Sequence, residues 1–445
     1  MRIVVAGAGA VGSHLAKMLS QENHDIILLD PNEDKLRQVG SVLDVMTRVG
    51  SALSIPDLLD TNIKKCDLFI AVAKTEEINI TASILSKRLG AKKTIARIDN
   101  QEYLYVKYKE HFTELGIDYM IYPEKIAARE IVGLLQQTGS SDVVDFSGGK
   151  LSLFAIKLED DAPILGKTLS QLKLETDKPQ FMAVAVTRSG KTIVPNGGYV
   201  FSASDLVYFI STQKDIDHML EYSGKKQYDV RDIMILGGSR VGMLAARDLG
   251  NHHNVKLIER DREKSYRLSN MLNNTLVING DGRDYNLLME EGLGKMDAFI
   301  SVTGDSEINI LSCMLAKKLG VKKTIAEVEN IDYIALAENM GIDTIINKKV
   351  IAASRIFRFT SSESVTAVKC LTGTDAEVME FVVKDGAKIM QGPLSEINFP
   401  KDSLVGGVIR NDESFIADGN TQILPGDKVV VFALPSAINK VAKFF

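Results

Sequence analysis

The chain has 445 residues, enough for about three average domains. It carries 53 Lys and Arg against 58 Asp and Glu, a net charge of −5, and this acidic balance disfavours general nucleic-acid binding. Three widely spaced cysteines, Cys66, Cys313 and Cys370, exclude a disulfide scaffold or zinc knuckle and indicate a reducing compartment. The apolar runs are shorter than the ~18 residues of a membrane span, so we expect a cytosolic protein without direct membrane insertion.

Short apolar runs alternate with amphipathic segments in the first part of the chain. The predicted strands are Arg2–Ala6, Asp25–Leu29, Leu43–Val49, Leu68–Ala73, Thr94–Ile98 and Tyr119–Tyr122. The predicted helices are Val11–Leu19, Pro31–Val39, Ser54–Asn62, Glu76–Leu89, Glu102–His111 and Glu124–Gln137. This alternation predicts an α/β fold with a Rossmann-like, doubly wound parallel sheet.

The same pattern returns later in the chain. Asp67–Tyr103 and Asp297–Tyr333 are identical at 19 of 37 ungapped positions, which indicates an internal duplication. Each copy ends in a segment rich in Val, Phe and Ile and broken by glycines, which predicts a small, strand-rich α+β domain. Gly224–Tyr228 is the predicted linker between the copies. We therefore expect four domains: large 1–139, small 140–222, large 229–359 and small 360–445.

A glycine-rich turn follows the first predicted strand. Gly7, Gly9 and Gly12 have the spacing of a dinucleotide-binding loop. In such a loop the first glycine permits a tight turn, the second lets the backbone approach a pyrophosphate, and the third permits close packing of the helix on the strand. Asp30 ends the second strand, where a carboxylate accepts hydrogen bonds from the ribose hydroxyls of a nucleotide. Pro31 follows it, rather than an arginine for a 2′-phosphate, so NAD(H) is favoured over NADP(H). A flavin or adenosylmethionine site and a loop that serves packing alone remain alternatives.

Further ligand candidates lie at the carboxyl ends of the next strands, where open α/β sheets bind ligands. They are Ser51 after the third strand, Ala73 and Lys74 after the fourth, and Arg97 in the fifth. Lys74 and Arg97 are candidates for phosphate contacts, with a solvated surface side chain as the alternative for Lys74. Glu77 and Asn79 recur as Glu307 and Asn309.

The second glycine loop differs from the first. It reads Gly237, Gly238, Ser239, Arg240, Val241 and Gly242, with Glu259 as the ribose acid. Ser239 occupies the close-approach position, where its Cβ should push a pyrophosphate outward, while Arg240 offers a compensating cation. Asp281 replaces Ser51, Gly304 replaces Lys74 and Glu327 replaces Arg97. NAD(H), another adenine nucleotide and a vestigial site all remain open for this loop.

The sequence shows no evident catalytic constellation. Tyr103 and Lys107 have the YxxxK spacing of short-chain dehydrogenases, but the second copy loses the lysine, so aromatic packing on a surface helix is favoured. The six histidines show no metal-ligand spacing. A nucleotide site without chemistry indicates a sensor that shifts a conformational equilibrium. A soluble NAD-dependent oxidoreductase is the alternative.

The residues also carry a family resemblance. The segment RIVVAGAGAVGSHLA with Asp30, the block AVAKTEEINITASILSKRLGAKKTIARI and the duplication resemble the TrkA family of peripheral Trk potassium-uptake subunits, built from RCK domains (TrkA-N and TrkA-C). The resemblance implies a non-enzymatic cytosolic regulator, peripheral at the inner face of the cell membrane, that responds to NAD(H) or ATP/ADP. It also implies a homo-oligomeric, tetrameric gating ring and an integral potassium-translocating partner of the TrkH or TrkG type.

The family's ligand positions map onto both copies. In the first they are Gly7, Ala8, Gly9, Ala10, Val11, Asp30, Ser51, Ala73, Lys74 and Arg97. In the second they are Gly237, Gly238, Ser239, Arg240, Val241, Glu259, Asp281, Thr303 and Gly304. The amphipathic helices Glu124–Gln137 and Lys348–Phe359 are expected to pack across neighbouring large domains.

Overall fold

The computed structural model describes residues 1–20, 24–136, 142–171, 181–188, 191–225, 228–330, 333–357, 359, 365–370 and 376–445. The predicted linker Gly224–Tyr228 therefore lies partly outside the described residues. The chain divides into two compact units. The first comprises Met1–Ala128 and Asn347–Ser361, and the second comprises Arg129–Ile346 and Ser362–Phe445.

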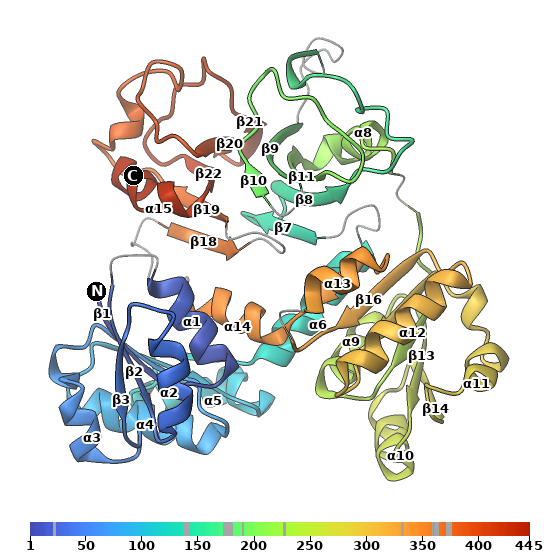
Figure 1. The fold of residues 1–445 in the computed structure, drawn as a ribbon, viewed down its shortest axis with the longest axis horizontal. Helices are drawn as coiled ribbons and strands as arrows, with labels where there is room; N and C mark the ends of the chain where they lie inside the picture. Colours follow the sequence, from blue (N-terminus) through green and yellow to red (C-terminus); the bar gives the residue numbers. More distant parts are fainter. Residues whose placement is uncertain are drawn as a thin grey trace. The chain divides into compact units, whose positions relative to one another are not determined.

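The first unit is built on a six-stranded parallel sheet with the order β3-β2-β1-β4-β5-β6 (Figure 1). Its strands are β1 (Arg2–Ala6), β2 (Asp25–Asp30), β3 (Met46–Val49), β4 (Leu68–Ala71), β5 (Lys93–Arg97) and β6 (Tyr119–Ile121). Its helices are α1 (Ala10–Ser20), α2 (Glu33–Gly40), α3 (Ile55–Asp60), α4 (Glu76–Leu89) and α5 (Val106–Glu114), followed by α6 (Pro123–Gln136). The order is that of a doubly wound sheet. Strand β4 is apolar throughout and β1 is apolar after Arg2, as is typical of central strands in a sheet that helices cover on both faces.

Most of the ranges predicted for this domain end within two residues of the observed elements, and two differ more. The strand expected at Leu43–Val49 begins at Met46, where its pairing with β2 starts. The helix expected at Glu102–His111 divides into a 3₁₀ turn capped by Asn100 and the separate helix α5, because the backbone of Tyr105 is extended between them.

Helix α14 (Lys348–Phe357) comes from the second copy of the repeat but packs in the first unit. Figure 1 shows it beside α1, which it contacts, and its buried residues include Ile356 and Phe357. The rings of Phe359 and Tyr119 also meet, with centroids 4.1 Å apart. This helix of the second copy thus packs within the first unit, against α1 of the first large domain. Helix α6 crosses the boundary between the two units after Ala128.

The second large domain repeats the parallel strand order, as β14-β13-β12-β15-β16-β17. Its strands are β12 (Asp232–Leu236), β13 (Asn254–Glu259), β14 (Thr275–Asn279), β15 (Ala298–Ser301), β16 (Lys323–Glu327) and β17 (Thr344–Ile346). Its helices are α9 (Arg240–Leu249), α10 (Arg262–Met271), α11 (Tyr285–Glu290), α12 (Ser306–Lys318) and α13 (Ile334–Asn339). Helix α13, with 6 residues, is shorter than its first-copy counterpart α5, with 9.

The same polar residues form hydrogen bonds at the amino edge of each large sheet, where its strands begin. In the first copy, Asp118 accepts hydrogen bonds from Thr94 N at 2.7 Å and from Lys87 Nζ at 2.9 Å. Their counterparts in the second copy are Asp343, Thr324 and Lys317, with distances of 2.8 and 2.6 Å. Much of the identity between the copies therefore serves the scaffold and lies at the edge opposite the ligand candidates.

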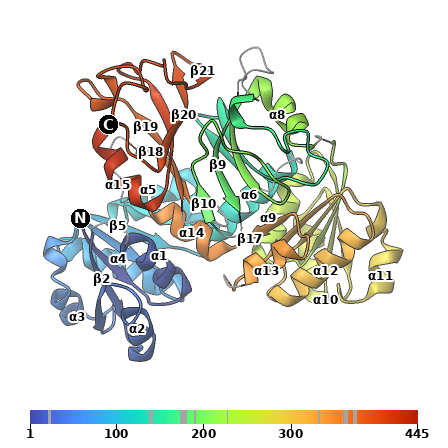
Figure 2. The same ribbon diagram turned by 45° about the horizontal axis from the view of Figure 1, so that its top comes forward.

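The two small domains share a core within the second unit (Figure 2). The first is an antiparallel sheet, β10-β9-β11-β8-β7, made of β7 (Asp142–Phe146), β8 (Leu151–Lys157), β9 (Phe181–Arg188), β10 (Lys191–Ile193) and β11 (Leu206–Thr212), with helix α8 (Ile216–Tyr222). The second, β18-β19-β22-β20-β21, contains β18 (Val365–Cys370), β19 (Glu377–Val382), β20 (Ser403–Arg410), β21 (Glu413–Ile416) and β22 (Lys428–Ala433), with helix α15 (Pro435–Val441). A Cβ on Gly407 would lie 2.8 Å from Leu151, so glycine permits this close packing.

Each small domain contains a bidentate arginine–aspartate ion pair. Arg188 donates to both oxygens of the buried Asp205, at 2.6 and 2.7 Å, and Arg410 repeats the pair with Asp427 at 2.9 and 2.7 Å. Burial alone would raise the pKa of Asp205, but hydrogen bonds, chiefly from Arg188, outweigh burial and hold that pKa below its usual value. These pairs explain the repeated aspartate before the last strand of each small domain.

Replacing Asp205 with Asn should destabilise the chain, because it removes a charge from a buried, fully hydrogen-bonded pair. We expect a loss of about 2 kcal/mol in unfolding free energy. The exposed Asp160→Asn is the matched control and should behave as wild type. Because the folded-state pKa of Asp205 is depressed, its contribution is complete above its unfolded pKa of about 3.9 and is lost as the pH falls through the folded pKa. Denaturant unfolding at pH 7 and pH 3 measures both effects, and equal stability of Asp205→Asn and wild type at pH 7 would contradict the assignment.

Candidate functional site

The first glycine loop lies between β1 and α1. Gly7 has φ +111°, and a Cβ there would lie 2.9 Å from the backbone of Ala73. A Cβ on Gly12 would lie 1.8 Å from the carbonyl oxygen of Gly7, so both glycines are required by the packing of the loop. Gly9 differs, because a Cβ at that position would meet no described protein atom within 4 Å. Packing among the described residues therefore does not require glycine at position 9, and the space beside it is open, as the predicted approach of a pyrophosphate needs.

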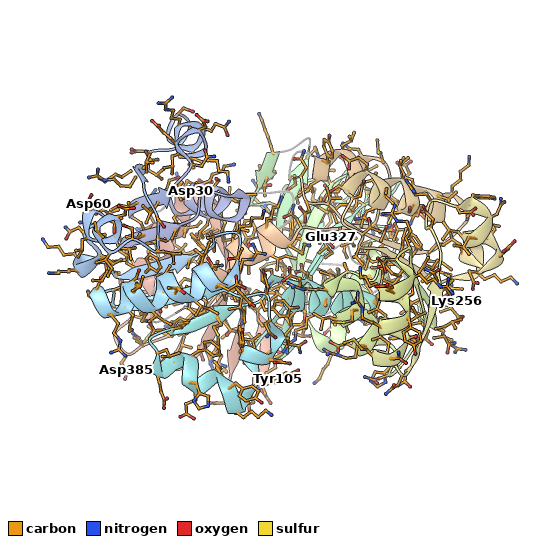
Figure 3. All side chains as sticks on the ribbon, turned by 90° about the horizontal axis from the view of Figure 1, so that it is seen from below. Asp30, Asp60, Tyr105, Lys256, Glu327 and Asp385 are labelled. Atoms are coloured by element: carbon orange, nitrogen blue, oxygen red, sulfur yellow. The ribbon has the colours of Figure 1, made fainter. Side chains whose placement is uncertain are left out.

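Asp30 stands at the end of β2, beside this loop (Figure 3), and is 7% exposed. Its Oδ2 accepts the backbone N–H of Ala8 at 2.7 Å, and its Oδ1 accepts that of Asn32 at 2.8 Å. A carboxylate offers about four acceptor positions, so two remain. The arrangement suits the two hydroxyls of an adenosine ribose.

The neighbouring strand ends hold the other predicted residues of the first site. Ser51 follows β3, and its backbone N–H donates a hydrogen bond to Oδ2 of Asp57 at 2.7 Å. Arg97 ends β5 and lies 3.3 Å from Asp99, while Lys74 is exposed after β4. These residues line the same carboxyl edge of the sheet as the glycine loop.

Asn79 is a positioning residue whose role the sequence did not reveal. It is 1% exposed, accepts the backbone N–H of Ala73 at 2.7 Å and donates to the carbonyl of Arg97 at 2.9 Å. It thereby ties the end of β4 to the end of β5. Asn309 makes the matching bonds to Thr303 at 3.0 Å and Glu327 at 2.7 Å. The identity of this asparagine in both copies was the available signal.

The second glycine loop repeats the turn with different chemistry. Gly237 has φ +101°, and a Cβ on Gly238 would lie 2.4 Å from Leu268. Ser239 caps helix α9, because its Oγ accepts the backbone N–H of Gly242 at 3.2 Å. That N–H belongs to the group of amides that a pyrophosphate would approach. The serine thus competes for an anion-binding donor, in addition to the steric effect expected from its Cβ.

Glu259 ends β13, at the position predicted for the second ribose acid. Its Oε2 accepts Gly238 N–H at 3.0 Å and Lys264 Nζ at 2.7 Å, and its Oε1 accepts Asp261 N–H at 2.9 Å. Burial alone would raise the pKa of Glu259, but these hydrogen bonds, above all that from Lys264, hold the pKa below its usual value. Hydrogen bonds from Arg283 lower the pKa of the nearby Asp281 to about 2.

Glu259, Lys264, Asp281 and Arg283 line a cleft of about 380 Å³ in the second large domain. Of the residues predicted for this site, Gly237, Ser239, Glu259, Asp281, Thr303 and Gly304 line the cleft. Gly238, Arg240 and Val241 do not, and Val241 is fully buried. Glu327, at the end of β16 (Figure 3), is 2% exposed and also lies outside the cleft lining. Arg260, Lys264 and Arg283, which sequence reasoning left out, contribute cations to the walls.

The other candidate catalytic side chains either pack against aromatic rings or are buried. The ring of Tyr103 packs against Phe112, with centroids 4.7 Å apart, and the ammonium of Lys107 lies over the ring of Tyr108. Burial raises the pKa of Cys66 to about 11 and also raises the pKa of Cys313, so neither thiol is a ready nucleophile. Within the described residues, no group of three or more His, Cys, Asp or Glu is placed to hold a metal ion.

A helix that crosses a bilayer needs about 20 predominantly apolar residues. Across the described ranges, no helix combines the length and apolar character needed to cross a membrane.

Known proteins resemble the chain along its whole length. The TrkA-N domain family matches residues 3–123 and 233–348, and the TrkA-C domain family matches residues 153–224 and 378–445. The chain is 33% identical over 454 aligned positions to Trk system potassium uptake protein TrkA homolog 2 of Methanosarcina mazei, with full coverage of both. It is 33% identical over 440 positions to Trk system potassium uptake protein TrkA of Vibrio alginolyticus, covering 97% of this chain and 95% of that one.

Solved structures share the fold at lower identity. A GsuK channel bound to NAD superposes with a TM-score of 0.61 at 17% identity, covering 100% of this chain and 78% of the channel chain. A GsuK structure bound to ADP has a TM-score of 0.51 at 14% identity, covering 80% of this chain and 67% of that chain. The tandem domain matches and the full-length relatives decide the family. The chain belongs to the TrkA family of Trk-system potassium uptake proteins.

Proposed function

We propose that this chain is the nucleotide-binding regulatory subunit of a membrane potassium-uptake system. The observation that carries the proposal is a carboxylate, Asp30 or Glu259, held against a glycine loop at the carboxyl edge of each large sheet. The relatives are named as Trk-system potassium uptake proteins, and the similar channel structures are described as bound to NAD and to ADP. NAD(H) and ATP/ADP are the ligands that we propose.

In the first site we propose a separate role for each of the predicted ligand residues. The amides of Gly7–Gly12 would receive the pyrophosphate at the start of α1, and Asp30 would accept the ribose hydroxyls. Ser51, Lys74 and Arg97 would border the remainder of the nucleotide. Asn79 would keep the two strand ends of this border in register through its bonds to Ala73 and Arg97.

We propose regulation by binding rather than catalysis. Hydride transfer requires an acid–base group beside the nicotinamide, and the Tyr103 and Lys107 side chains instead pack on aromatic neighbours. A soluble NAD-dependent oxidoreductase is the competing function. It predicts turnover of NADH with a panel of carbonyl compounds, whereas the regulatory function predicts binding without turnover.

The proposed partner is an integral potassium-translocating subunit, with this chain at the cytoplasmic face of the membrane as a tetrameric ring. A chain with net charge −5 and no evident basic amphipathic segment has little attraction for anionic lipid. Recruitment would therefore come from docking on an integral protein. Nucleotide exchange would shift the ring between conformations in proportion to the difference in affinity for them.

Replacing Asp30 with Ala should weaken NADH binding at the first site about tenfold to a hundredfold, because charged hydrogen bonds contribute about 1.5–3 kcal/mol. Calorimetric titration of the full chain measures the affinity. Asp34→Ala, which changes an exposed acid on α2, is the matched control and should bind as wild type. Equal NADH affinity in wild type and Asp30→Ala would remove the assignment of the first site.

Replacing Ser239 with Gly should tighten dinucleotide binding at the second site several-fold. The change frees the N–H of Gly242 and removes the Cβ, while a Ser-to-Gly change at a helix cap costs only a few tenths of a kcal/mol. Titration in the Asp30→Ala background isolates the second site. Unchanged or weaker binding would show that Ser239 does not limit this site.

Potassium flux tests the regulatory role. Liposomes containing the cognate translocating subunit should change their flux when this chain is added and its nucleotide is exchanged. Asp30→Ala should blunt the response to nucleotide while leaving the assembled ring intact by light scattering. If flux is the same with and without the chain under every nucleotide, the regulatory function is wrong.

A further inference from the structure

The carboxylates of Asp30 and Glu259 differ in the number of hydrogen-bond acceptor positions that remain for a ligand. Asp30 accepts two backbone N–H groups, one on each oxygen. Glu259 accepts two backbone N–H groups and also the ammonium of Lys264 at 2.7 Å. With about four acceptor positions on a carboxylate, Asp30 can receive both ribose hydroxyls, whereas Glu259 can receive one.

The region around Glu259 in the second cleft carries more positive charge than the matching region around Asp30. Arg260 directly follows Glu259 and lines the cleft together with Lys264, whereas the first copy has Pro31 at the position of Arg260. The side chain of Arg260 is exposed and makes no ion pair in the part of the chain that is described. The first-copy counterpart of Lys264 is Lys35, which is also exposed and forms no ion pair with Asp30 among the described residues.

We propose that the second cleft selects an adenine nucleotide whose ribose carries a phosphate on the 2′ oxygen, of which NADP(H) is the dinucleotide form. This selectivity rests on the proposed nucleotide-binding function. The 3′ hydroxyl would donate to the one remaining position on Glu259, and the phosphate would lie between Arg260 and Lys264. The first site would keep its preference for the unphosphorylated ribose.

Charge supports this division between the sites. A phosphate monoester carries about −1.5 to −2 charges at pH 7, so a bare ribose carboxylate repels it. In the second site the ammonium of Lys264 offsets the charge of Glu259, and Arg260 supplies a planar cation suited to phosphate. In the first site Asp30 receives backbone N–H groups alone, and Pro31 has no donor.

The decisive experiment compares NADPH with NADH in the full-length Asp30→Ala chain, where the first site is weakened. NADPH should bind the second site about tenfold to a hundredfold more tightly than NADH. Arg260→Gln should abolish that preference. Arg262→Gln is the matched control, because Arg262 lies two residues away, is exposed and does not line the cleft. In the otherwise wild-type chain, Pro31→Arg should raise the NADPH affinity of the first site.

Each outcome decides a separate question. NADH binding as tightly as NADPH, or an unchanged preference in Arg260→Gln, overturns the 2′-phosphate inference and leaves the proposed function standing. Failure of NADH, NADPH, ATP and ADP to bind this site overturns both the inference and the second site. Adenosine 2′,5′-bisphosphate should compete with NADPH, whereas tighter competition by adenosine 3′,5′-bisphosphate would reject the 2′ assignment.

Discussion

A hydrogen bond from a glycine-loop amide to a strand-end carboxylate sets the ligand edge of each large domain. Ala8 donates to Asp30 at 2.7 Å, and Gly238 donates to Glu259 at 3.0 Å. The bond needs a chain that turns sharply after the first strand, which the positive φ of Gly7 or Gly237 permits. It brings together an acid, a helix start and a turn, although the acid and the loop amide lie 22 residues apart in the first copy and 21 in the second.

The two edges of each large sheet have diverged to different degrees since the duplication. At the amino edge, Asp118 and Asp343 make the same bonds to a threonine amide and a lysine. At the carboxyl edge, the Ser239 hydroxyl accepts the N–H of Gly242, whereas the matching Gly9 has no side chain, and Lys264 donates to Glu259. A retained scaffold with altered ligand groups is the expected physical basis for two sites with different ligand preferences in one chain.

The sequence predicted the sheets well because continuous apolar runs and glycine turns are local signals. It did not predict that α14 packs against α1, since an amphipathic pattern shows that a helix has an apolar face but not which surface it covers. It placed Asp30 and Glu259 at strand ends, where the structure has them. It missed the Lys264–Glu259 contact and the cap formed by Ser239, because both depend on side-chain directions that spacing does not give.

The central claim is that one chain holds two nucleotide sites of different preference. Native mass spectrometry of the intact protein in an equimolar mixture of NADH and NADPH tests it directly, because the two ligands differ by the mass of a phosphate. We expect each chain to carry one NADH and one NADPH when both sites are filled. Chains without bound nucleotide, or chains filled at random with both ligands, would contradict it.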